Sequence, residues 1–165
     1  MKYPLINDWV MFLLTLTFAG LVSASDFRLP PELVKGPDAC AECHKETVKA
    51  WKASHHSTTF LKMPRSDEAR VIADKMGIKR IKSDSDCLAC HFTANLESNK
   101  PKPIAGISCE SCHGAGEPWI DIHSDYGGKG VKAENETAAH KVARYNESEE
   151  KGMIRPSNLY QLAAN

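Results

Sequence analysis

The sequence predicts a mainly α-helical fold, in which helices and long loops rather than a layered sheet carry the functional residues. Apolar residues recur at helical spacing in the segments expected to fold, and no segment shows the alternation of a strand. Leu, Ile, Val and Phe are thinly spread after the first 25 residues, and aromatic residues make up 7% of the chain. A core built from side chains alone would therefore be weak.

The chain of 165 residues has the length of one domain and carries 21 basic and 21 acidic side chains. A net charge of zero argues against a nucleic-acid-binding protein, which would carry a basic stripe. The unusual counts are those of cysteine and histidine, with six and seven residues. The functional interpretation rests on these two residue types.

Residues 1–24 are predicted to be a secretory signal peptide. Lys2 lies near the N-terminus, an apolar stretch of about 13 residues follows over 10–22, and small residues precede a cleavage point after Ala24. The stretch is shorter than the roughly 20 residues of a membrane span. We therefore expect a mature domain over 25–165 in the periplasm, with no membrane span after cleavage. The alternative is an uncleaved signal that anchors the protein to the inner membrane.

Three helical segments are expected, over residues 46–57, 67–76 and 137–151. Ser66 can cap the start of the second segment, and Gly77 can end it. Within that segment, apolar residues that include Ile72 and Met76 recur at helical spacing, so that Met76 is expected in the core.

Two further segments are expected to interrupt the helices. Residues 100–103 contain two prolines and should break any helix between the second and third cysteine motifs. Residues 127–130 contain three glycines and should form a flexible link before the last helical segment.

All six cysteines fall into three copies of the pattern C-x-x-C-H, which is the attachment signature of c-type haem. In this chemistry two thiols add to the two vinyl groups on one porphyrin edge, and two intervening residues let both sulfurs reach that edge from one turn of backbone. The histidine that follows is the expected proximal ligand of the iron. The three motifs are Cys40, Cys43 and His44; Cys87, Cys90 and His91; and Cys109, Cys112 and His113.

Zinc and disulfides are the competing interpretations of these cysteines. Zinc binding by paired C-x-x-C knuckles does not require a histidine directly after each second cysteine, and a tetrahedral site would leave ligands over. A disulfide that closes a C-x-x-C pair is usually redox-active rather than structural. The sequence therefore favours three covalently bound haems c, each with its iron.

The second axial ligand of each iron would come from a spare histidine or a methionine. His44 and His56 lie twelve residues apart on the expected helix, about 18 Å along its axis, so His56 should serve a different haem from the one it follows. His55 is expected to be a surface residue or a partner of a haem propionate. His123 follows the third motif across a segment rich in Gly and Pro that permits a tight turn, and is also expected to bind iron. His140 lies in a charged helical segment, and both a ligand role and a surface position remain open for it.

Three segments of the chain resemble the multihaem cytochrome c-554 family. They are Trp51-x-x-Ser54-x-His56, residues 86–93 around the second motif, and residues 106–115 around the third. The resemblance covers about residues 37–165. It implies a small, mainly α-helical multihaem cytochrome c, with helices and long loops wrapped around closely packed haems, that carries electrons in the periplasm. It also implies that His56 and His123 are distal iron ligands.

One feature departs from the family pattern. Relatives usually carry four haems, and a segment that resembles residues 158–163 leads directly into a fourth C-x-x-C-H motif. This sequence ends at Asn165 without one. We therefore expect a tetrahaem protein shortened at its C-terminus, and four spare histidines for three haems are consistent with that.

The expected function is electron transfer between redox partner proteins through three haems. The alternative is a multihaem oxidoreductase in which one haem has an open coordination position and acts on a small nitrogen compound or a peroxide. Each haem brings two propionates. The holoprotein is therefore expected to be acidic at its haem edges and to dock with basic surfaces of its partners, more weakly at high salt.

Overall fold

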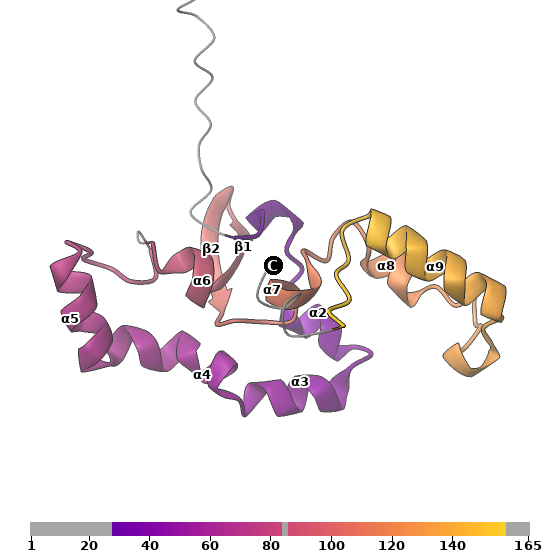
Figure 1. Ribbon diagram of the computed structural model, residues 1–165, viewed down its shortest axis with the longest axis horizontal. Coiled ribbons are helices and arrows are strands. Elements are labelled where there is room, and N and C mark those ends of the chain that lie inside the picture. The colour runs from indigo at the N-terminus through magenta and orange to yellow at the C-terminus, as the bar shows by residue number, and fades with distance from the viewer. Residues whose placement is uncertain (1–27, 84–85, 158–165) are drawn as a thin grey trace, which may run out of the picture.

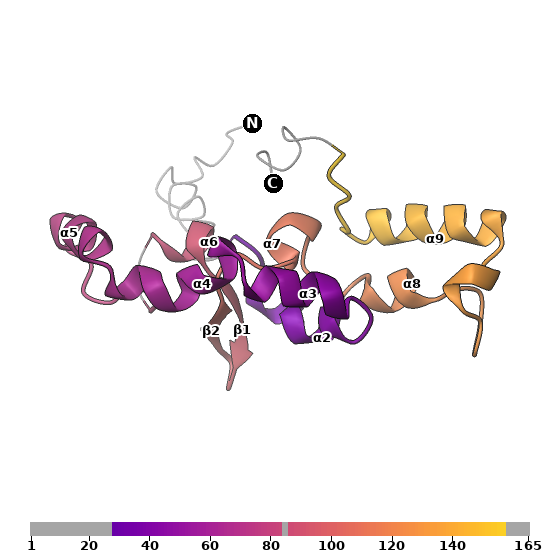
Figure 2. The same ribbon diagram turned by 90° about the horizontal axis from the view of Figure 1, so that it is seen from below.

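The computed structural model describes residues 28–83 and 86–157. The expected signal peptide and residues 158–165, with the segment that resembles the approach to a fourth motif, lie outside the described residues. The described chain is elongated, with α5 at one end and α9 at the other (Figures 1 and 2). Between them lie a β-hairpin and the short helices that contain the cysteine motifs.

The described elements follow one another as short helices with one hairpin inserted between them. In chain order they are a 3₁₀ turn at Pro31–Leu33, α2 (Pro37–Ala41), α3 (Lys45–Lys52), α4 (His55–Lys62), a 3₁₀ turn at Met63–Arg65, α5 (Asp67–Lys75), α6 (Leu88–His91), β1 (Thr93–Glu97), β2 (Lys100–Ala105), α7 (Glu110–His113), α8 (Ile120–Ser124), a 3₁₀ turn at Ala133–Asn135 and α9 (Ala138–Glu150). The mainly α fold class is therefore confirmed. Within the described ranges, no helix is long and apolar enough to cross a membrane.

The prediction of one continuous helix over 46–57 is wrong, because the chain breaks between α3 and α4. Ser54 adopts an extended conformation and caps α4, its hydroxyl accepting a hydrogen bond from the Ser57 N–H at 3.3 Å. His44 is the N-cap residue of α3, and His56 lies in the first turn of α4. The two histidines therefore do not share one helix axis.

The second predicted helix is confirmed as α5. The Ser66 hydroxyl accepts the Ala69 N–H at 3.1 Å, and Gly77 follows the helix with a φ of 71°. The core position predicted for Met76 is wrong, since Met76 is 51% exposed and Ile72 is 56% exposed. α5 lies at one end of the molecule, and of its residues Ala73 packs into the buried core with Ala69 against it, so apolar side chains elsewhere on α5 face solvent.

The third predicted helix is confirmed as α9. Thr137 is its N-cap residue and accepts the His140 N–H at 3.2 Å. α9 packs along α8, and the two helices form one end of the molecule (Figure 2).

The expectation that the chain contains no strand is wrong, because β1 and β2 form an antiparallel hairpin. Their two-residue turn is Ser98-Asn99, with φ values of 51° and 59°, the left-handed pair that a tight hairpin requires. Pro101 and Pro103 lie in β2, where the sequence predicts only a break. Both strands are edges of a two-stranded sheet, and edge strands tolerate proline.

The side-chain core is small, as the composition predicts. One buried cluster joins Ala73, Ile81, Leu88 and Phe92 next to the second motif. The other buried apolar side chains of the described chain are scattered: Val34, Val48, Ala94, Ala105 and Trp119.

Candidate haem-binding sites

Each C-x-x-C-H motif forms one turn of helix, as its spacing predicts. The N–H of the motif histidine donates to the carbonyl oxygen of the first cysteine four residues earlier, at 2.9, 3.0 and 2.9 Å in the three motifs. This bond places two thiols and one imidazole on a single turn. All six cysteines are free thiols, and His44, His91 and His113 are exposed. The arrangement is the one required to bind a porphyrin edge through two thioethers.

Among the described residues, no group of three or more His, Cys, Asp or Glu side chains is gathered in a way that could hold a metal ion. The motifs thus stand as three separate pairs of thiols, each with its own histidine.

The first and third motifs are neighbours in space. A side-chain hydrogen bond with Cys40 lowers the pKa of the Cys109 thiol to about 7, and the same contact raises the pKa of Cys40. The first cysteines of two motifs therefore lie close together in the folded chain.

Glu110, inside the third motif, binds the backbone segment that precedes the first motif. Its carboxylate is 2% exposed and accepts the N–H groups of Lys35, Gly36 and Gly116 at 2.9, 2.8 and 2.7 Å. A buried carboxylate is tolerated when its oxygens are hydrogen-bonded in this way. The sequence predicts no role for Glu110. Its position between Cys109 and Cys112 is the one feature of the sequence that could have drawn attention to it.

The imidazole rings of His44 and His123 lie next to each other, although the two residues are far apart in the sequence. Their ring centroids are 6.1 Å apart, and their planes differ by 22°. Two imidazoles bound to opposite sides of one metal ion have ring centres roughly 6 Å apart, given a metal–nitrogen bond of about 2 Å. The structure therefore brings the proximal histidine of the first motif and a predicted distal histidine to the separation of an axial ligand pair.

The surroundings of His123 fit a haem. Within the described residues, the buried side-chain polar atoms without a hydrogen-bond partner are His123 Nδ1 and Trp119 Nε1, and these two side chains meet edge to face at 5.8 Å. Burial, and then the charge of Arg144, lower the pKa of His123. A neutral imidazole with a free nitrogen is the form that binds iron, and the indole N–H is available to a propionate.

Arg144 on α9 holds the helix that carries His123. It donates to the His123 carbonyl oxygen at 2.7 Å and binds both carboxylate oxygens of Glu136, also at 2.7 Å. Both side chains are nearly buried. The hydrogen bond from Arg144 lowers the pKa of Glu136 to about 2, so this pair is charged at neutral pH. Neither residue stands out in the sequence.

His140 lies beside this ion pair. Its Nδ1 is 2.8 Å from Glu136 Oε1, and its ring packs against Gly127. A carboxylate on one ring nitrogen is the usual support of a histidine that binds metal through the other. Its role as an iron ligand remains a prediction.

His56 is held next to the segment that leads into the third motif. The Trp51 indole N–H donates to the Ile107 carbonyl oxygen at 2.8 Å. A Cβ atom at Gly106 would collide with the His56 carbonyl oxygen, so only glycine allows α4 this close. Both contacts lie within three residues of Cys109.

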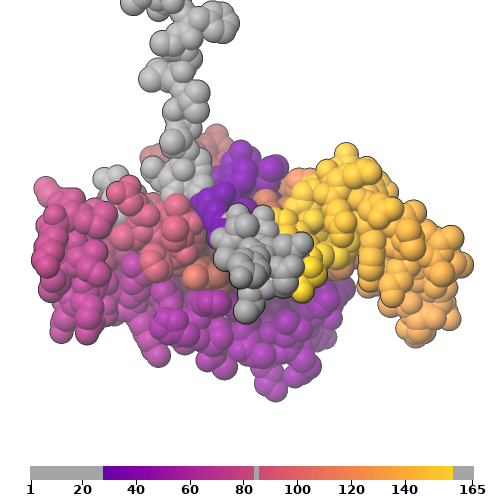
Figure 3. Space-filling view, viewed as in Figure 1, coloured from indigo at the N-terminus to yellow at the C-terminus, as the bar shows by residue number. Residues whose placement is uncertain are grey.

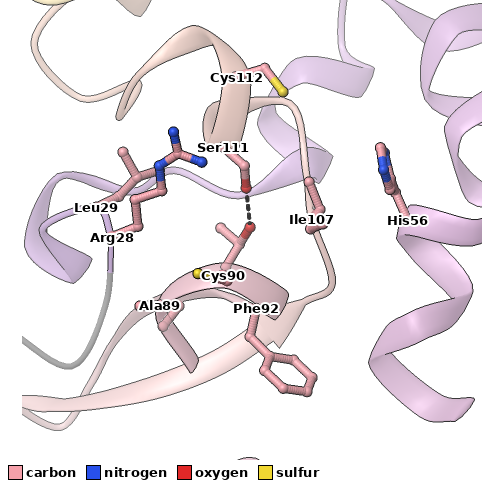
Figure 4. Close-up of a pocket in the computed structure, with 11 residues that line it drawn as sticks. Arg28, Leu29, His56, Ala89, Cys90, Phe92, Ile107, Ser111 and Cys112 are labelled. Atoms are coloured by element: carbon pink, nitrogen blue, oxygen red, sulfur yellow. Dashed lines mark hydrogen bonds between the residues drawn. The ribbon is translucent and has the colours of Figure 1, made fainter. Parts of the chain in front are cut away.

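A cavity of about 290 Å³ opens between His56 and two motifs. The second cysteines of the second and third motifs, Cys90 and Cys112, line it together with His56 (Figure 4). Thr93 and Ser111 also line it and share a 3.0 Å hydrogen bond. The cavity therefore joins a predicted distal histidine to one thiol of the second motif and one of the third.

The C-terminal segment after α9 orients the histidine of the third motif. His113 Nδ1 lies 2.9 Å from the Ile154 carbonyl oxygen, and the Ile154 N–H donates to the His113 carbonyl oxygen at 2.8 Å. With a proton on Nδ1, the lone pair of Nε2 is left for iron. The sequence shows no sign of this contact, because a backbone carbonyl can come from any residue.

Three helical C-x-x-C-H turns with free thiols, the first with a second imidazole beside its histidine, define a c-type cytochrome. The family model described as "Cytochrome c554 and c-prime" matches residues 39–114. Cytochrome c-554 of Nitrosomonas europaea (strain ATCC 19718 / CIP 103999 / KCTC 2705 / NBRC 14298) is 30% identical over an alignment of 141 positions, which covers 76% of this chain and 60% of that protein. The chain therefore belongs to the cytochrome c-554 family, whose haem c is covalently bound. It spans 60% of the length of that curated relative, and no solved structure matches it.

Proposed function

We propose that this protein relays electrons between redox partner proteins through three covalently bound haems c. The observation that carries the proposal is the proximity of the first and third motifs, which are linked by hydrogen bonds from the Lys35 and Gly36 N–H groups to the Glu110 carboxylate. Haems attached through neighbouring cysteines lie close together, and a carrier needs closely spaced irons. When bound, each haem supplies a reversible one-electron couple.

The placement of the histidines indicates which of them would hold each haem. His44 and His123 would hold one haem iron, supported by the 6.1 Å separation of their rings. His113 and His56 would hold another, supported by the position of His56 next to the third motif and by Cys112 in the shared cavity. His91 would hold the haem of the second motif. Bis-histidine ligation would give lower potentials than His/Met ligation.

The protein residues around the ligands keep them in place and in the correct protonation state. Ile154 fixes the ring orientation of His113, and burial keeps His123 neutral. Arg144 restrains the backbone of His123, and the carboxylate of Glu110 fastens the first motif to the third. Fixed ligands reduce the rearrangement that accompanies each change of iron charge.

We place the protein in the periplasm. The support is the signal peptide predicted over residues 1–24 and the six thiols reserved for haem. The alternative location is the periplasmic face of the inner membrane, if the signal stays attached.

An oxidoreductase is the second candidate, and the second motif favours it. α6, which ends in His91, lies away from α8 and α9, the helices that carry His123 and His140 (Figures 1 and 2). With His56 assigned to the third motif, an iron at His91 would have an open position unless His55 or Met63 fills it. An open position is where a small nitrogen compound or a peroxide would bind.

Mass spectrometry and electron paramagnetic resonance of the purified holoprotein test both candidates. The mass gives the number of haems and the cleavage site, and resonance gives the spin state of each iron. Three low-spin irons that are reduced and reoxidised reversibly support the relay. One high-spin iron that binds nitrite or nitric oxide supports the enzyme, and fewer than three haems contradicts the relay as stated.

A further inference from the structure

The α5 end of the molecule carries an unpaired basic surface. We call it the α5 face; its cations are Lys62, Arg65, Arg70, Lys75, Lys79, Arg80 and Lys82. All are exposed except the partly buried Lys82, and none forms an ion pair within the described chain. The same stretch contains three acidic residues, so positive charge dominates.

Part of this surface is hollow. A cavity of about 480 Å³ lies between α5 and residues 78–83, and four cations line it against one acid, Asp74. The four cations are Arg70, Lys79, Arg80 and Lys82. The Lys82 ammonium lies 3.3 Å from the centre of the Phe60 ring, and burial, followed by the charge of Arg65, lowers the pKa of Lys82. The hollow is therefore a place where cations repel one another and an anion would be stabilised.

Apolar side chains lie exposed beside the cations. Four of the large apolar residues exposed on the described surface belong to this end of the molecule: Leu61, Val71, Ile72 and Met76, each more than half exposed. Apolar groups with a charged rim are typical of docking surfaces for other proteins. Figure 3 shows α5 at the end of the molecule opposite α9, with its outer side uncovered.

The α5 face is connected to the second motif through the core. Ala73, Ile78 and Ile81 line the hollow, and the same side chains pack with Leu88 and Cys87. One layer of side chains thus separates the surface from the cysteine that begins the second motif. The haem of that motif would be the redox group nearest to anything docked on this face.

We propose that the α5 face docks an acidic redox protein, whose carboxylates enter the hollow and whose electrons pass through the haem of the second motif. The proposal rests on the proposed electron-transfer function and names the surface, the sign of the partner and the haem involved. It differs from the acidic haem edges expected from the propionates, because the described polypeptide is basic at this end.

The test uses the full-length holoprotein and a small acidic flavodoxin, reduced to its hydroquinone, as the electron donor. The variant Arg70→Glu, Lys79→Glu, Arg80→Glu reverses three charges of the hollow. The control Lys129→Glu, Lys132→Glu, Lys141→Glu makes the same change of net charge at the α9 end, where all three side chains are exposed. We expect the second-order rate at low salt to fall about tenfold or more in the first variant, with loss of its salt dependence, and much less in the control.

Two outcomes of the rate measurement overturn the proposal: equal rates in the first variant and the wild type, or equal losses of rate in both variants. Binding to anionic phosphatidylglycerol vesicles is measured in parallel. If the first variant loses only vesicle binding and keeps the flavodoxin rate, the face binds membranes and the proposal is also overturned. Reduced lumiflavin, a small neutral donor, separates this from the proposed function. If lumiflavin reduces all variants equally and reversibly, a negative result concerns docking alone. If lumiflavin fails to reduce the wild-type haems reversibly, the electron-transfer function itself fails.

Discussion

The indole nitrogen of Trp51 donates a hydrogen bond to the carbonyl oxygen of Ile107 at 2.8 Å, which joins α3 to the segment before the third motif. α4 follows α3 after two residues, so this bond also sets where His56 lies. It gives a physical reason for the pairing of a tryptophan and a histidine in the Trp51-x-x-Ser54-x-His56 segment. The tryptophan fixes the helix pair, Ser54 starts the second helix, and the histidine reaches the cavity beside Cys112.

Replacing His56 by alanine should convert one low-spin iron to high spin while the number of bound haems stays at three. The reason is that the thioethers and His113 remain, and only the sixth ligand is lost. Electron paramagnetic resonance and holoprotein mass measure the two quantities. His55→Ala is the matched control, because His55 precedes it on the same exposed turn. A larger spectral change in the His55 variant would reverse the assignment.

Replacing His123 by alanine should free one side of the iron bound by His44, and added imidazole should restore the low-spin signal. His140→Ala is the comparison, since His140 contacts Glu136 rather than His44. We expect the His140 variant to keep the signal of the first haem. If His140→Ala alone removes it, the His44–His123 pair is not the axial pair.

Gly106→Ala should destabilise the holoprotein by about 3 kcal/mol, because the new methyl group meets the His56 carbonyl oxygen and neither backbone can move freely. Gly77→Ala provides the control. Gly77 has a φ of 71° but no atom within 4 Å of its added methyl group, so the backbone alone costs about 1 kcal/mol. Urea unfolding measures both values. Only the Gly106 variant should also disturb the spin state of the iron bound by His56; equal spectra in both variants contradict that link.

Glu110→Gln should lower the free energy of unfolding by about 2–3 kcal/mol. In the wild type a carboxylate oxygen accepts the Gly36 N–H, whereas in the variant the amide NH₂ group would face that N–H, donor against donor. Glu117→Gln is the control, because Glu117 forms an exposed ion pair with Lys35 whose loss should cost less than about 1 kcal/mol. Unfolding of the two holoproteins in urea distinguishes them. Similar stability in both variants would mean that Glu110 does not fasten the first motif to the third.

Several parts of the fold follow from local signals in the sequence. α5 and α9 begin at Ser66 and Thr137, whose hydroxyls accept a backbone N–H three residues later. Such caps act within one turn, so they are visible in the sequence. The hairpin escaped prediction because Ser98-Asn99 is a weak turn signal and because the prolines of β2 indicate a break. The break between α3 and α4 was missed although Ser54 is a cap, since residues 46–57 contain no Gly or Pro to mark it.

The haem-binding turns were determined by the sequence itself. Two cysteines and a histidine within five residues can reach one porphyrin edge without help from the rest of the chain, and each motif forms the expected turn. Which spare histidine lies near which motif was decided only by the tertiary structure. His123 reaches His44 because Arg144 and Glu136 hold α8 against α9, and His56 reaches the third motif because Gly106 allows close approach. These contacts join residues far apart in the chain, and no short pattern of residues encodes such distances.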